Sequence, residues 1–384
     1  NLHFIDNTSS ENDYIHEAEY KRTGVLVNQM GYYPEFKKQA TVVVEENDMT
    51  AKEFMVVDIN GTFVYTGTTT PVGFDKDSGD WVHIADFSAL KTEGTDYAVI
   101  CDGKMSHPFN IGNYIYDGVL TNAMNYYYQN RSGINIESKY ITSGDASTLA
   151  HQGGHMTDNA YIQDKWVKSY LADGSDVQKT KTQNVTGGWY DAGDHGKYVV
   201  NGGISVWMLN NIYERSLVLG NATKWADDSG TVIIPENGNN APDILDETRY
   251  EVEWFFTMLV KDGSYKNMVY HKMHDHKWTG LAVKPWDYES EWGTIRIIKP
   301  ASTAATLNFV ACAAQSYRLW KNYDSDFANQ CIEQAKLSYE AAKANPSMYA
   351  PLDQAIGGGA YGDDNVKDDF YWAACELYAA TGDE

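Results

Sequence analysis

The spacing of apolar residues changes abruptly near Gly112, and this change constrains the fold more than any other feature. Before it, short apolar runs alternate with turns, as in QATVVVEEND and EFMVVDINGTFVYTG. After it, apolar residues recur at helical spacing over several turns. Strands and helices bury their faces with different periods, so the two parts need different architectures. The sequence predicts a flexible polar leader at 1–23, a β-sandwich at 24–112 and an all-α domain at 113–384.

Both parts carry local signals for these elements. The Asn-Gly pair at 60–61 separates two strand-like runs and tolerates the positive φ angles of a hairpin turn. Asp246 and Ser302 each precede a helical pattern and predict helix starts. The loops at 140–190 and 261–299 are long for a compact helical domain, which favours a functional role. Six segments are predicted to be helices: 116–131, 202–217, 244–260, 302–320, 326–344 and 368–383.

The charge balance excludes several kinds of partner. The chain has 53 acidic and 30 basic side chains, and its net charge of −23 repels nucleic-acid phosphates and anionic lipid surfaces. No run of about 18 apolar residues occurs, so no membrane-spanning segment is expected. The chain opens at Asn1, as a mature exported protein would, which predicts a secreted, extracellular or cell-surface location. Four scattered cysteines are expected to be buried thiols: Cys101, Cys312, Cys331 and Cys375.

Aromatic residues are abundant, with 28 Tyr, 11 Trp and 12 Phe making up 13% of the chain. Aromatic faces stack on the C–H faces of sugar rings, while short polar side chains bond the hydroxyls. The alternative is that these rings fill helix interfaces. Composition alone leaves both interpretations open.

The stretch GGWYDAGDHGKY, residues 187–198, places two aspartates three positions apart among glycines and aromatic residues. Paired carboxylates can share a water molecule, with one orienting it and the other removing its proton. The glycines would permit close approach of a bulky substrate. The alternative is an Asx-turn and helix N-cap, in which Asp194 caps a helix beginning near Tyr198. The flanking aromatic residues favour a site formed by Asp191 and Asp194.

This stretch and three others together resemble glycoside hydrolase family 9, the inverting β-1,4-glucanases. VLVNQMGYYPEFKKQA resembles the start of the immunoglobulin-like domain that precedes the catalytic domain in one branch of the family. APDILDETRYEVEWFFTML and GGGAYGDDNVKDDFYWAACELYAATGD resemble later landmarks in the right order. The resemblance implies an immunoglobulin-like β-sandwich followed by an (α/α)6 barrel of twelve helices, incomplete in this chain.

The resemblance also implies roles for individual residues. Asp194 would be the base that deprotonates the attacking water, and Asp191 would help to position that water. Histidine and aromatic side chains would bind the sugar, although a structural role is an equal alternative for the last three of them: His195, Tyr198, His271, Trp278 and Tyr361.

Two metal sites deserve consideration. Oxygen-bearing side chains crowd into GDDNVKDD, a composition that suits calcium, and the resemblance implies calcium at this place. An acidic helix start, favoured by the helix dipole, is the alternative. Relatives with the immunoglobulin-like domain also carry a Cys/His zinc site before the D-A-G-D motif, but here that loop has His151 and His155 without a cysteine, which makes zinc doubtful. The proposed calcium ligands are Asp363, Asn365, Asp368 and Asp369, with Asp364 beside them.

The resemblance leaves one catalytic group unassigned. An inverting mechanism needs a general acid about 6.5–9.5 Å from the base. In the family this acid is a glutamate near the end of the catalytic domain, beyond a His-x-Arg landmark, and neither occurs by Glu384. Glu247 and Glu251 are expected on a helix surface, and Glu289 and Glu291 lie in a Trp-rich loop. A C-terminal segment or a second chain is therefore expected to complete the barrel.

Together these observations predict an enzyme that hydrolyses β-1,4-linked glucan with inversion. One alternative is an exo-acting relative, such as a cellobiohydrolase, a β-glucosidase or an exo-glucosaminidase. A second alternative, from another class, is a non-hydrolytic glycan-binding fragment that lacks the general acid. Hydrolysis by the isolated chain would distinguish the enzymes from this fragment.

Overall fold

The computed structural model describes residues 23–167, 175–280, 283–287, 295–353 and 356–383. The chain divides into two compact units, Asn1–Gly118 and Val119–Glu384. Nearly all of the predicted leader lies outside the described residues, as do Glu289 and Glu291.

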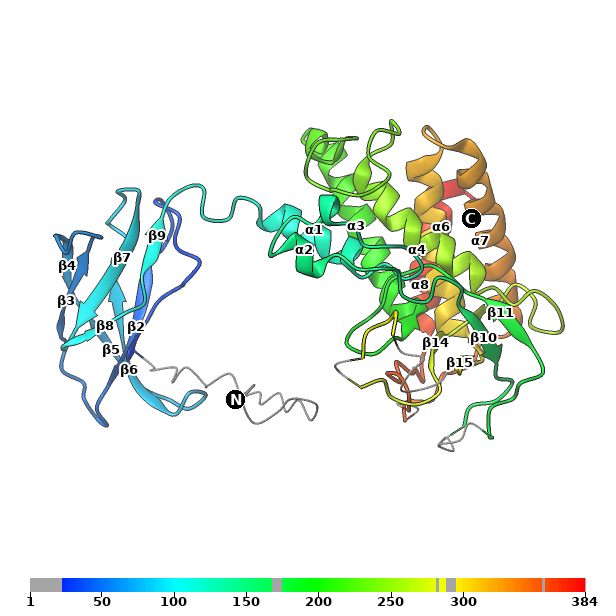
Figure 1. The fold of residues 1–384 in the computed structure, drawn as a ribbon, viewed down its shortest axis with the longest axis horizontal. Coiled ribbons are helices and arrows are strands. Elements are labelled where there is room, and N and C mark those ends of the chain that lie inside the picture. Colours follow the sequence, from blue (N-terminus) through cyan, green and yellow to red (C-terminus); the bar gives the residue numbers. More distant parts are fainter. Residues whose placement is uncertain (1–22, 168–174, 281–282, 288–294, 354–355, 384) are drawn as a thin grey trace. The chain divides into compact units, whose positions relative to one another are not determined.

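The first unit is a sandwich of two antiparallel sheets (Figure 1). One sheet has the strand order β1-β2-β6-β5, and the other has the order β4-β3-β7-β8 with β9 also paired to β7. The strands are β1 Val25–Leu26, β2 Gln39–Val44, β3 Glu53–Val57, β4 Phe63–Thr68, β5 Thr70–Asp75, β6 Asp80–Asp86, β7 Gly94–Cys101, β8 Lys104–Met105 and β9 Phe109–Ile111.

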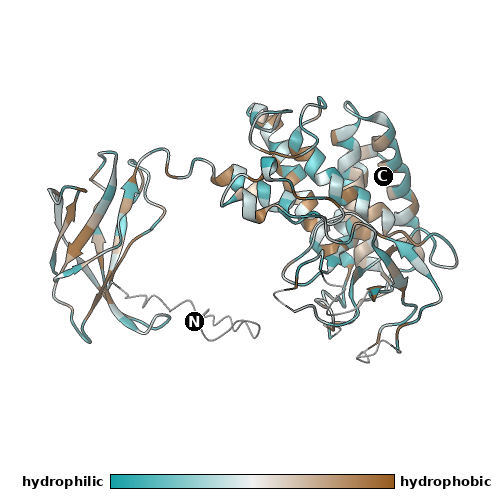
Figure 2. Cartoon of the chain, viewed as in Figure 1, coloured by the Kyte–Doolittle hydropathy of each residue, from teal (hydrophilic) through white to brown (hydrophobic). Residues whose placement is uncertain are grey.

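Alternating side chains build the core of this sandwich. Every second residue of β2 is buried, and Val42 packs in one cluster with Phe54 of β3 and Val99 of β7. Apolar and polar segments alternate along the strands in Figure 2. The predicted hairpin is confirmed, since β3 and β4 pair antiparallel around the turn where Gly61 has a φ of 76°. The alternation thus accounts for which face of each strand is buried.

The second unit contains all six helices that the periodicity predicts. They are α1 Val119–Gln129, α3 Val199–Val218, α4 Asp243–Thr257, α6 Thr303–Trp320, α7 Ser325–Ala344 and α8 Lys367–Thr381, with shorter helical turns at α2 Ala146–Leu149, η1 Ser138–Tyr140 and η2 Ala222–Trp225.

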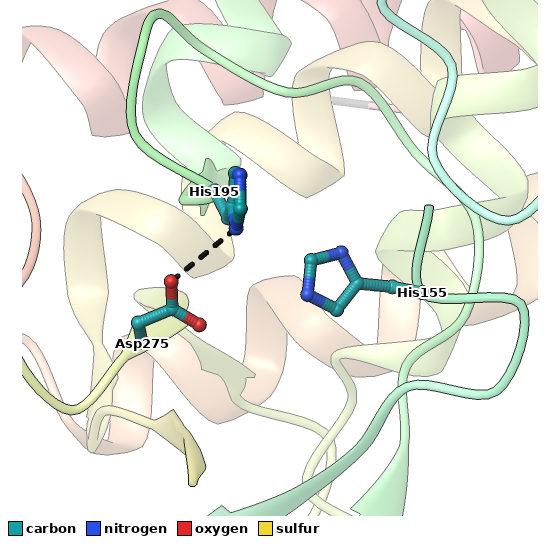
Figure 3. A group of neighbouring side chains, drawn as sticks. All are labelled: His155, His195 and Asp275. Carbon is teal, nitrogen blue, oxygen red and sulfur yellow. Dashed lines mark ion pairs between the residues drawn. The ribbon is translucent and has the colours of Figure 1, made fainter. Parts of the chain in front are cut away.

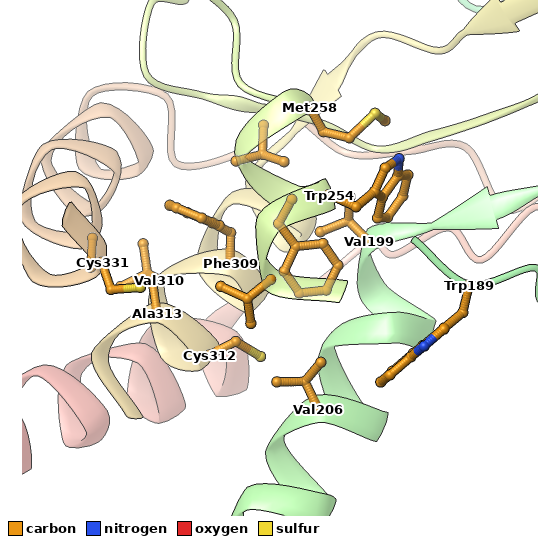
Figure 4. Close-up of a cluster of buried hydrophobic side chains, with 14 of the residues drawn as sticks. Trp189, Val199, Val206, Trp254, Met258, Phe309, Val310, Cys312, Ala313 and Cys331 are labelled. Atoms are coloured by element: carbon orange, nitrogen blue, oxygen red, sulfur yellow. The ribbon is translucent and has the colours of Figure 1, made fainter. Parts of the chain in front are cut away.

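Helix α6 forms the centre of this unit and packs against α3, α4, α7 and α8. It is buried on nearly all sides, and its many alanines allow neighbouring helices to approach closely. Figure 4 shows Phe309 and Cys312 of α6 in the same cluster as Val206 of α3 and Trp254 of α4. The alanine-rich run in the sequence is therefore the core helix of the domain.

Short strands lie in or next to the segments that the sequence predicted as long loops. One sheet has the order β11-β10-β15-β14-β12 and a second pairs β13 with β16. Four of these strands lie together at one end of the helices in Figure 1. Their bounds are β10 Asn159–Ile162, β11 Thr182–Asn184, β12 Lys197–Tyr198, β13 Val269–Tyr270, β14 Lys272–Asp275, β15 Arg296–Ile298 and β16 Ala301–Ser302.

The helix-start predictions had different outcomes. Ser302 is the N-cap of α6 and accepts a hydrogen bond from the Ala305 amide, as expected. Asp246 was wrong as a start signal, because α4 already begins at Asp243, directly after Pro242. Proline fixes φ and supplies no amide donor, so it suits the residue that precedes a helix.

Three of the four cysteines are buried free thiols, as predicted, but Cys375 on α8 is exposed. The prediction was wrong for Cys375 because α8 buries only Ala373 among its residues. Within the described part of the chain, every helix is too short or too polar to cross a membrane.

Candidate active site

The two aspartates of the D-A-G-D motif lie in the turn that leads into β12 and α3. Helix α3 begins at Val199, and its N-cap Tyr198 makes no side-chain capping bond. Asp194 Oδ2 instead accepts hydrogen bonds from the Gly196 amide at 3.1 Å and from the Tyr198 hydroxyl at 2.6 Å. Asp194 is therefore not the cap of this helix, but its bond from the Gly196 amide is that of an Asx-turn, so its catalytic role stays a prediction.

Gly196 is required by the packing of this turn. A Cβ at this position would lie 2.6 Å from Tyr198 Cζ, and closer still to the Tyr198 hydroxyl and to Asp194 Oδ2. The Asp191 amide also donates to the carbonyl of Gly196 at 3.1 Å, which closes the turn. A side chain at 196 would therefore push Asp194 away from its hydroxyl donor.

The two carboxylates differ in how their oxygens are occupied. Asp191 has both oxygens bonded, Oδ1 to Asn201 Nδ2 at 2.7 Å and Oδ2 to the Tyr361 hydroxyl at 2.8 Å. Asp194 takes both of its hydrogen bonds at Oδ2, and within the described residues Oδ1 receives none. Both side chains are half-buried, so they can be reached by solvent. Only Asp194 thus keeps a carboxylate oxygen available to accept a proton from water.

Tyr198 and Tyr361 form one edge of this site. Their rings meet edge to face with centroids 4.8 Å apart. Burial, and then the Asp194 carboxylate, raises the pKa of the Tyr198 hydroxyl, so it stays a proton donor. Tyr361 has a φ of 45°, which is uncommon for a residue with a bulky side chain and is typical of functional sites.

Lys272 supports the segment that carries Tyr361. Its Nζ donates to the carbonyls of Gly358 and Gly359, while the Gly359 amide donates to the Tyr198 hydroxyl at 3.0 Å. Burial lowers the pKa of Lys272 to about 8, and Asp194 opposes this change. The carboxylate of Asp194 therefore interacts electrostatically with the ammonium group of Lys272 on the neighbouring strand β14.

The other predicted sugar-binding residues are more dispersed. His195 is buried, with Nδ1 3.4 Å from Asp275 Oδ2 and Nε2 3.1 Å from the Val283 carbonyl. His271 is fully buried against Ser302, and burial lowers its pKa to about 4. Trp278 is 47% exposed in the loop after β14. The structure thus groups only Tyr198 and Tyr361 directly around the aspartates, and a sugar contact by the other three stays a prediction.

A buried ionic network supports the turn that carries Asp191 and Asp194. Arg296 of β15 bonds Asp158 through Nε and Nη2, both at 3.0 Å, and also donates to Asp275 Oδ1 and to the His195 carbonyl. Lys197 bonds Asp158 as well as the carbonyls of residues 185 and 187. Burial opposes ionisation of Asp158, but Arg296 and Lys197 overcome it and hold its pKa below the usual range. The sheet therefore anchors the backbone on either side of Asp194.

Figure 3 shows a possible metal site made of His155, His195 and Asp275, whose ligand atoms lie within 4.8 Å of one another. The site does not fit a metal ion well, because Arg296 already bonds Asp275 and its positive charge opposes a second cation. Burial and Arg296 lower the pKa of His155 to about 2, and its Nδ1 lies 2.5 Å from the Tyr190 hydroxyl.

His151 lies elsewhere and stacks on the ring of Trp286 at 4.0 Å. The two histidines of the loop before the motif, His151 and His155, are thus engaged with different aromatic partners. Within the described part of the chain, these two histidines are therefore not brought together as ligands of one zinc ion.

The acidic segment before α8 contains the proposed calcium ligands Asp363, Asn365, Asp368 and Asp369. Asp369 accepts a hydrogen bond from Asn308 at 3.0 Å, and burial, followed by Asp368 and Asp363, raises its pKa to about 6. Asp363 Oδ1 accepts the Asn365 amide at 2.9 Å. Among the described residues these carboxylates do not form a group of three with ligand atoms within 4.8 Å of one another, so the calcium site stays a prediction.

Two glutamates of α4 were misjudged from the sequence. Glu247 and Glu251 were expected on the surface, but both are fully buried. Glu247 bonds Arg131 through Nε and Nη2 and also the Trp189 indole, while Glu251 accepts the Trp189 amide at 2.7 Å. Burial raises the pKa of Glu251 to about 8, so its side chain carries a proton at neutral pH.

Glu251 also lines a pocket of about 130 Å³ that reaches Asp191, Asn201 and Tyr198. Gly202 packs so closely that a Cβ there would collide with Glu251 Oε1. The spacing of Glu247 and Glu251, one helical turn apart on one face of α4, was the signal that could have indicated a shared buried role.

A β-sandwich followed by a helical domain is the domain order of one group of glycosyl hydrolases. The Glycosyl hydrolase family 9 pattern matches residues 116–384, and the Cellulase N-terminal ig-like domain matches residues 21–106. The chain belongs to glycosyl hydrolase family 9. The predicted fold class is therefore confirmed: an immunoglobulin-like sandwich followed by helices of an (α/α)6 barrel.

Known relatives are longer than this chain. It is 45% identical to a cellulose 1,4-beta-cellobiosidase of Acetivibrio thermocellus over 96% of its own length, and 42% identical to endoglucanase C of Cellulomonas fimi over 94%. These matches cover 42% and 32% of the two relatives. This chain thus spans less than half the length of either relative.

Solved structures show the same fold. A family 9 protein of Bacteroides ovatus superimposes with a TM-score of 0.76 at 29% identity, covering 94% of this chain and 62% of that one. A metagenome-derived family 9 endoglucanase gives 0.74 at 30% identity, covering 94% and 61%. A Zn-binding triple mutant of the family 9 endoglucanase J30 gives 0.72 at 29% identity, covering 91% and 60%.

Proposed function

We propose that this chain supplies the base side of an enzyme that hydrolyses β-1,4-linked glucan with inversion. Asp194 accepts the proton of the attacking water at Oδ1, while Asp191 orients that water. The observation that carries this assignment is the unequal bonding of the two carboxylates: Asp191 has both oxygens occupied, whereas Asp194 has one oxygen without a donor among the described residues.

The substrate proposed for the site is a β-glucan chain in a secreted or cell-surface setting. The relatives carry the names endoglucanase and cellobiosidase, which supports this substrate class. Tyr361 is 43% exposed beside Asp191 and Trp278 is 47% exposed, so both rings can stack on sugars. His195, Tyr198 and His271 would shape the site from behind. The proposed calcium ion near Asp369 would stabilise the start of α8.

We also propose that a C-terminal segment or a second chain completes the barrel and brings the general acid. Ile204, Met208 and Ile212 form an exposed apolar stripe one turn apart along α3. Tyr371 and Tyr378 form another on α8, and α8 is joined to α3 by the bond from Trp207 to Glu376. Such stripes are typical of helices that bury their second face against further helices.

Asp194→Asn in the protein that hydrolyses β-glucan tests the assignment of the base. The amide keeps the shape of the side chain but cannot accept a proton, so we expect turnover to fall about 10²–10⁴-fold with oligosaccharide affinity nearly unchanged. Asp326→Asn on the exposed surface of α7 is the matched control and should retain full activity. Substantial hydrolysis by Asp194→Asn would move the base elsewhere.

The stereochemistry and the products test the rest of the proposal. NMR of the first product should show the α-anomer, since inversion at a β-linkage gives α; a β-anomer would contradict the mechanism. The 45% identity to a cellobiosidase keeps exo-action open, and cellobiose as the sole early product would favour it. An isolated chain that binds oligosaccharide without cleaving it would support the need for the completing segment.

A further inference from the structure

The helical unit has a second cavity, apart from the pocket at Asp191. Its volume is about 940 Å³, and residues of β10 and β11 and of the segments that follow α4 and α7 line it. It shares no lining residue with the pocket that Asp191, Tyr198 and Glu251 line. Sites for small molecules have volumes of about 300–1,000 Å³. The cavity is therefore large enough for a ligand with several rings, outside the reacting centre.

Aromatic side chains are prominent among the residues that line this cavity. Tyr265 is 49% exposed and Tyr349 is 43% exposed, and Trp166 and Tyr270 contribute two further rings. Exposed aromatic faces can stack on the C–H faces of sugar rings. The lining thus offers the kind of apolar surface that a glycan needs.

Backbone hydrogen bonds hold the two exposed tyrosines in place. The Met268 amide donates to the Tyr265 carbonyl at 3.0 Å, which closes a turn at Tyr265. Met348, which precedes Tyr349, donates its amide to the Thr303 hydroxyl and accepts the Thr303 amide at its carbonyl, each at 2.9 Å. Side chains on segments that are already ordered lose less freedom when a ligand binds, which favours affinity.

Two buried amide side chains in the lining have an acceptor without a donor. Gln163 and Gln183 are only 5% and 7% exposed. Each donates from Nε2 to backbone carbonyls, Gln163 to that of residue 178 and Gln183 to those of residues 257 and 259. Within the described part of the chain, the Oε1 atoms of both accept no hydrogen bond. A buried acceptor without a partner favours a ligand that brings donors, as sugar hydroxyls do.

The charged side chains in the lining balance one another. They are Lys181 and Lys261 on one side of the balance and Asp164 and Asp262 on the other, in a chain whose net charge is −23. A strongly charged ligand gains affinity where the protein presents the opposite charge. This cavity presents no excess of either sign, so its lining suits a neutral ligand.

Contacts through two residues join the cavity to the active site. The rings of Trp166 and His271 meet edge to face with centroids 5.7 Å apart, and His271 Nε2 lies 3.3 Å from the Ala360 carbonyl. Tyr361 follows Ala360 and bonds Asp191. One long polymer can therefore engage both places, whereas a short oligosaccharide occupies one of them.

We propose that this cavity is an accessory binding site for a β-glucan strand, separate from the site of hydrolysis. The proposal rests on the proposed β-glucan hydrolase function, because it assigns the same polysaccharide to a second place. Tyr265 and Tyr349 stack on sugar rings, and Gln163 and Gln183 accept hydrogen bonds from hydroxyls. A strand held here raises the effective concentration of the polymer at Asp194. The site thus acts on polymeric substrate and leaves the turnover of short oligosaccharides unchanged.

Kinetics on a polymer and on a short oligosaccharide test the proposal. The double variant Tyr265→Ala/Tyr349→Ala of the enzyme that hydrolyses β-glucan should show a KM for hydroxyethyl cellulose that is about 5–50-fold higher, since each lost stacking contact weakens binding. Its kcat and KM on cellotetraose should stay within about twofold of the parent. Tyr323→Ala is the matched control, because Tyr323 is 46% exposed and does not line the cavity.

The number of bound oligosaccharides gives a second measurement. In the Asp194→Asn background, which prevents hydrolysis, isothermal titration with cellotetraose should give one molecule fewer per chain for the double variant than for the protein with both tyrosines. The Tyr323→Ala control should keep the full number. If the double variant does not fold, the single variants Tyr265→Ala and Tyr349→Ala decide, because each removes one exposed ring.

The opposite results are equally specific. If the parent hydrolyses β-glucan but the double variant has the same KM for the polymer and binds as many oligosaccharides, the accessory site is wrong and the proposed function stands. If the double variant loses turnover of cellotetraose as well, the cavity belongs to the site of hydrolysis and is not a separate site. A parent that neither binds nor hydrolyses β-glucan would overturn the proposed function itself.

Discussion

Replacing Gly196 with alanine should separate the position of Asp194 from the stability of the fold. The new Cβ would lie 2.6 Å from Tyr198 Cζ, and closer still to the Tyr198 hydroxyl and Asp194 Oδ2. Carbon atoms in contact lie about 3.5–4.0 Å apart, so these side chains must move by roughly 1 Å. Gly196 is not among the residues with positive φ, so the alanine adds little backbone strain.

The size of the effect follows from this displacement. Overpacking of this kind costs about 1–3 kcal/mol of stability. A displacement of about 1 Å in a catalytic group can lower the rate about 10²-fold. We therefore expect kcat on β-glucan to fall about 100-fold, measured as reducing ends released, with KM changed by much less. Urea unfolding at the same pH gives the loss of stability independently.

Two further variants make this prediction sharper. Gly187→Ala is the control: it has a φ of 99° and open space around it, so strain should lower stability without changing kcat much. Adding Tyr198→Phe to Gly196→Ala removes the hydroxyl that makes the closest contact. Stability should then recover in part while kcat stays low, because Asp194 has lost its donor. A folded Gly196→Ala protein with kcat within about twofold of the parent would refute the role of this contact.

Two other substitutions probe the support of the turn. Arg296→Met should destabilise the chain by about 3–5 kcal/mol in urea unfolding, because it leaves Asp158 and Asp275 buried without their guanidinium partner; a loss below about 1 kcal/mol would show that the ion pairs are dispensable. Glu251→Gln should change how stability depends on pH. The folded-state pKa of Glu251 is raised from 4.5 to about 8, so its contribution is complete below about pH 4.5 and is lost as the pH rises to about 8. The variant should gain stability over the parent between pH 5 and pH 8, since glutamine has no charge to bury and can still accept the Trp189 amide; an equal pH dependence of both proteins would contradict the buried, protonated state.

The helices could be predicted from the sequence because their apolar residues repeat within the same segment. The small strands could not, since β12 has two residues and pairs with a strand far along the chain, at Lys197 and Met273. Glu247 was misjudged for a related reason: a charged helix position is usually exposed, and its partner Arg131 lies 116 residues away. The aspartate pair was found from its local pattern, but that pattern did not indicate which oxygens are occupied.

The occupied oxygens explain why the motif needs partners from several parts of the chain. Asn201 of α3 and Tyr361 of the segment before α8 fix both oxygens of Asp191, whereas Tyr198 and the Gly196 amide bond only one oxygen of Asp194. A carboxylate with both oxygens bonded is held in one orientation, and one with an oxygen open can accept a proton. The difference in chemistry between two identical side chains three residues apart therefore comes from the elements that surround them, and a turn without these neighbours would have two equivalent acids.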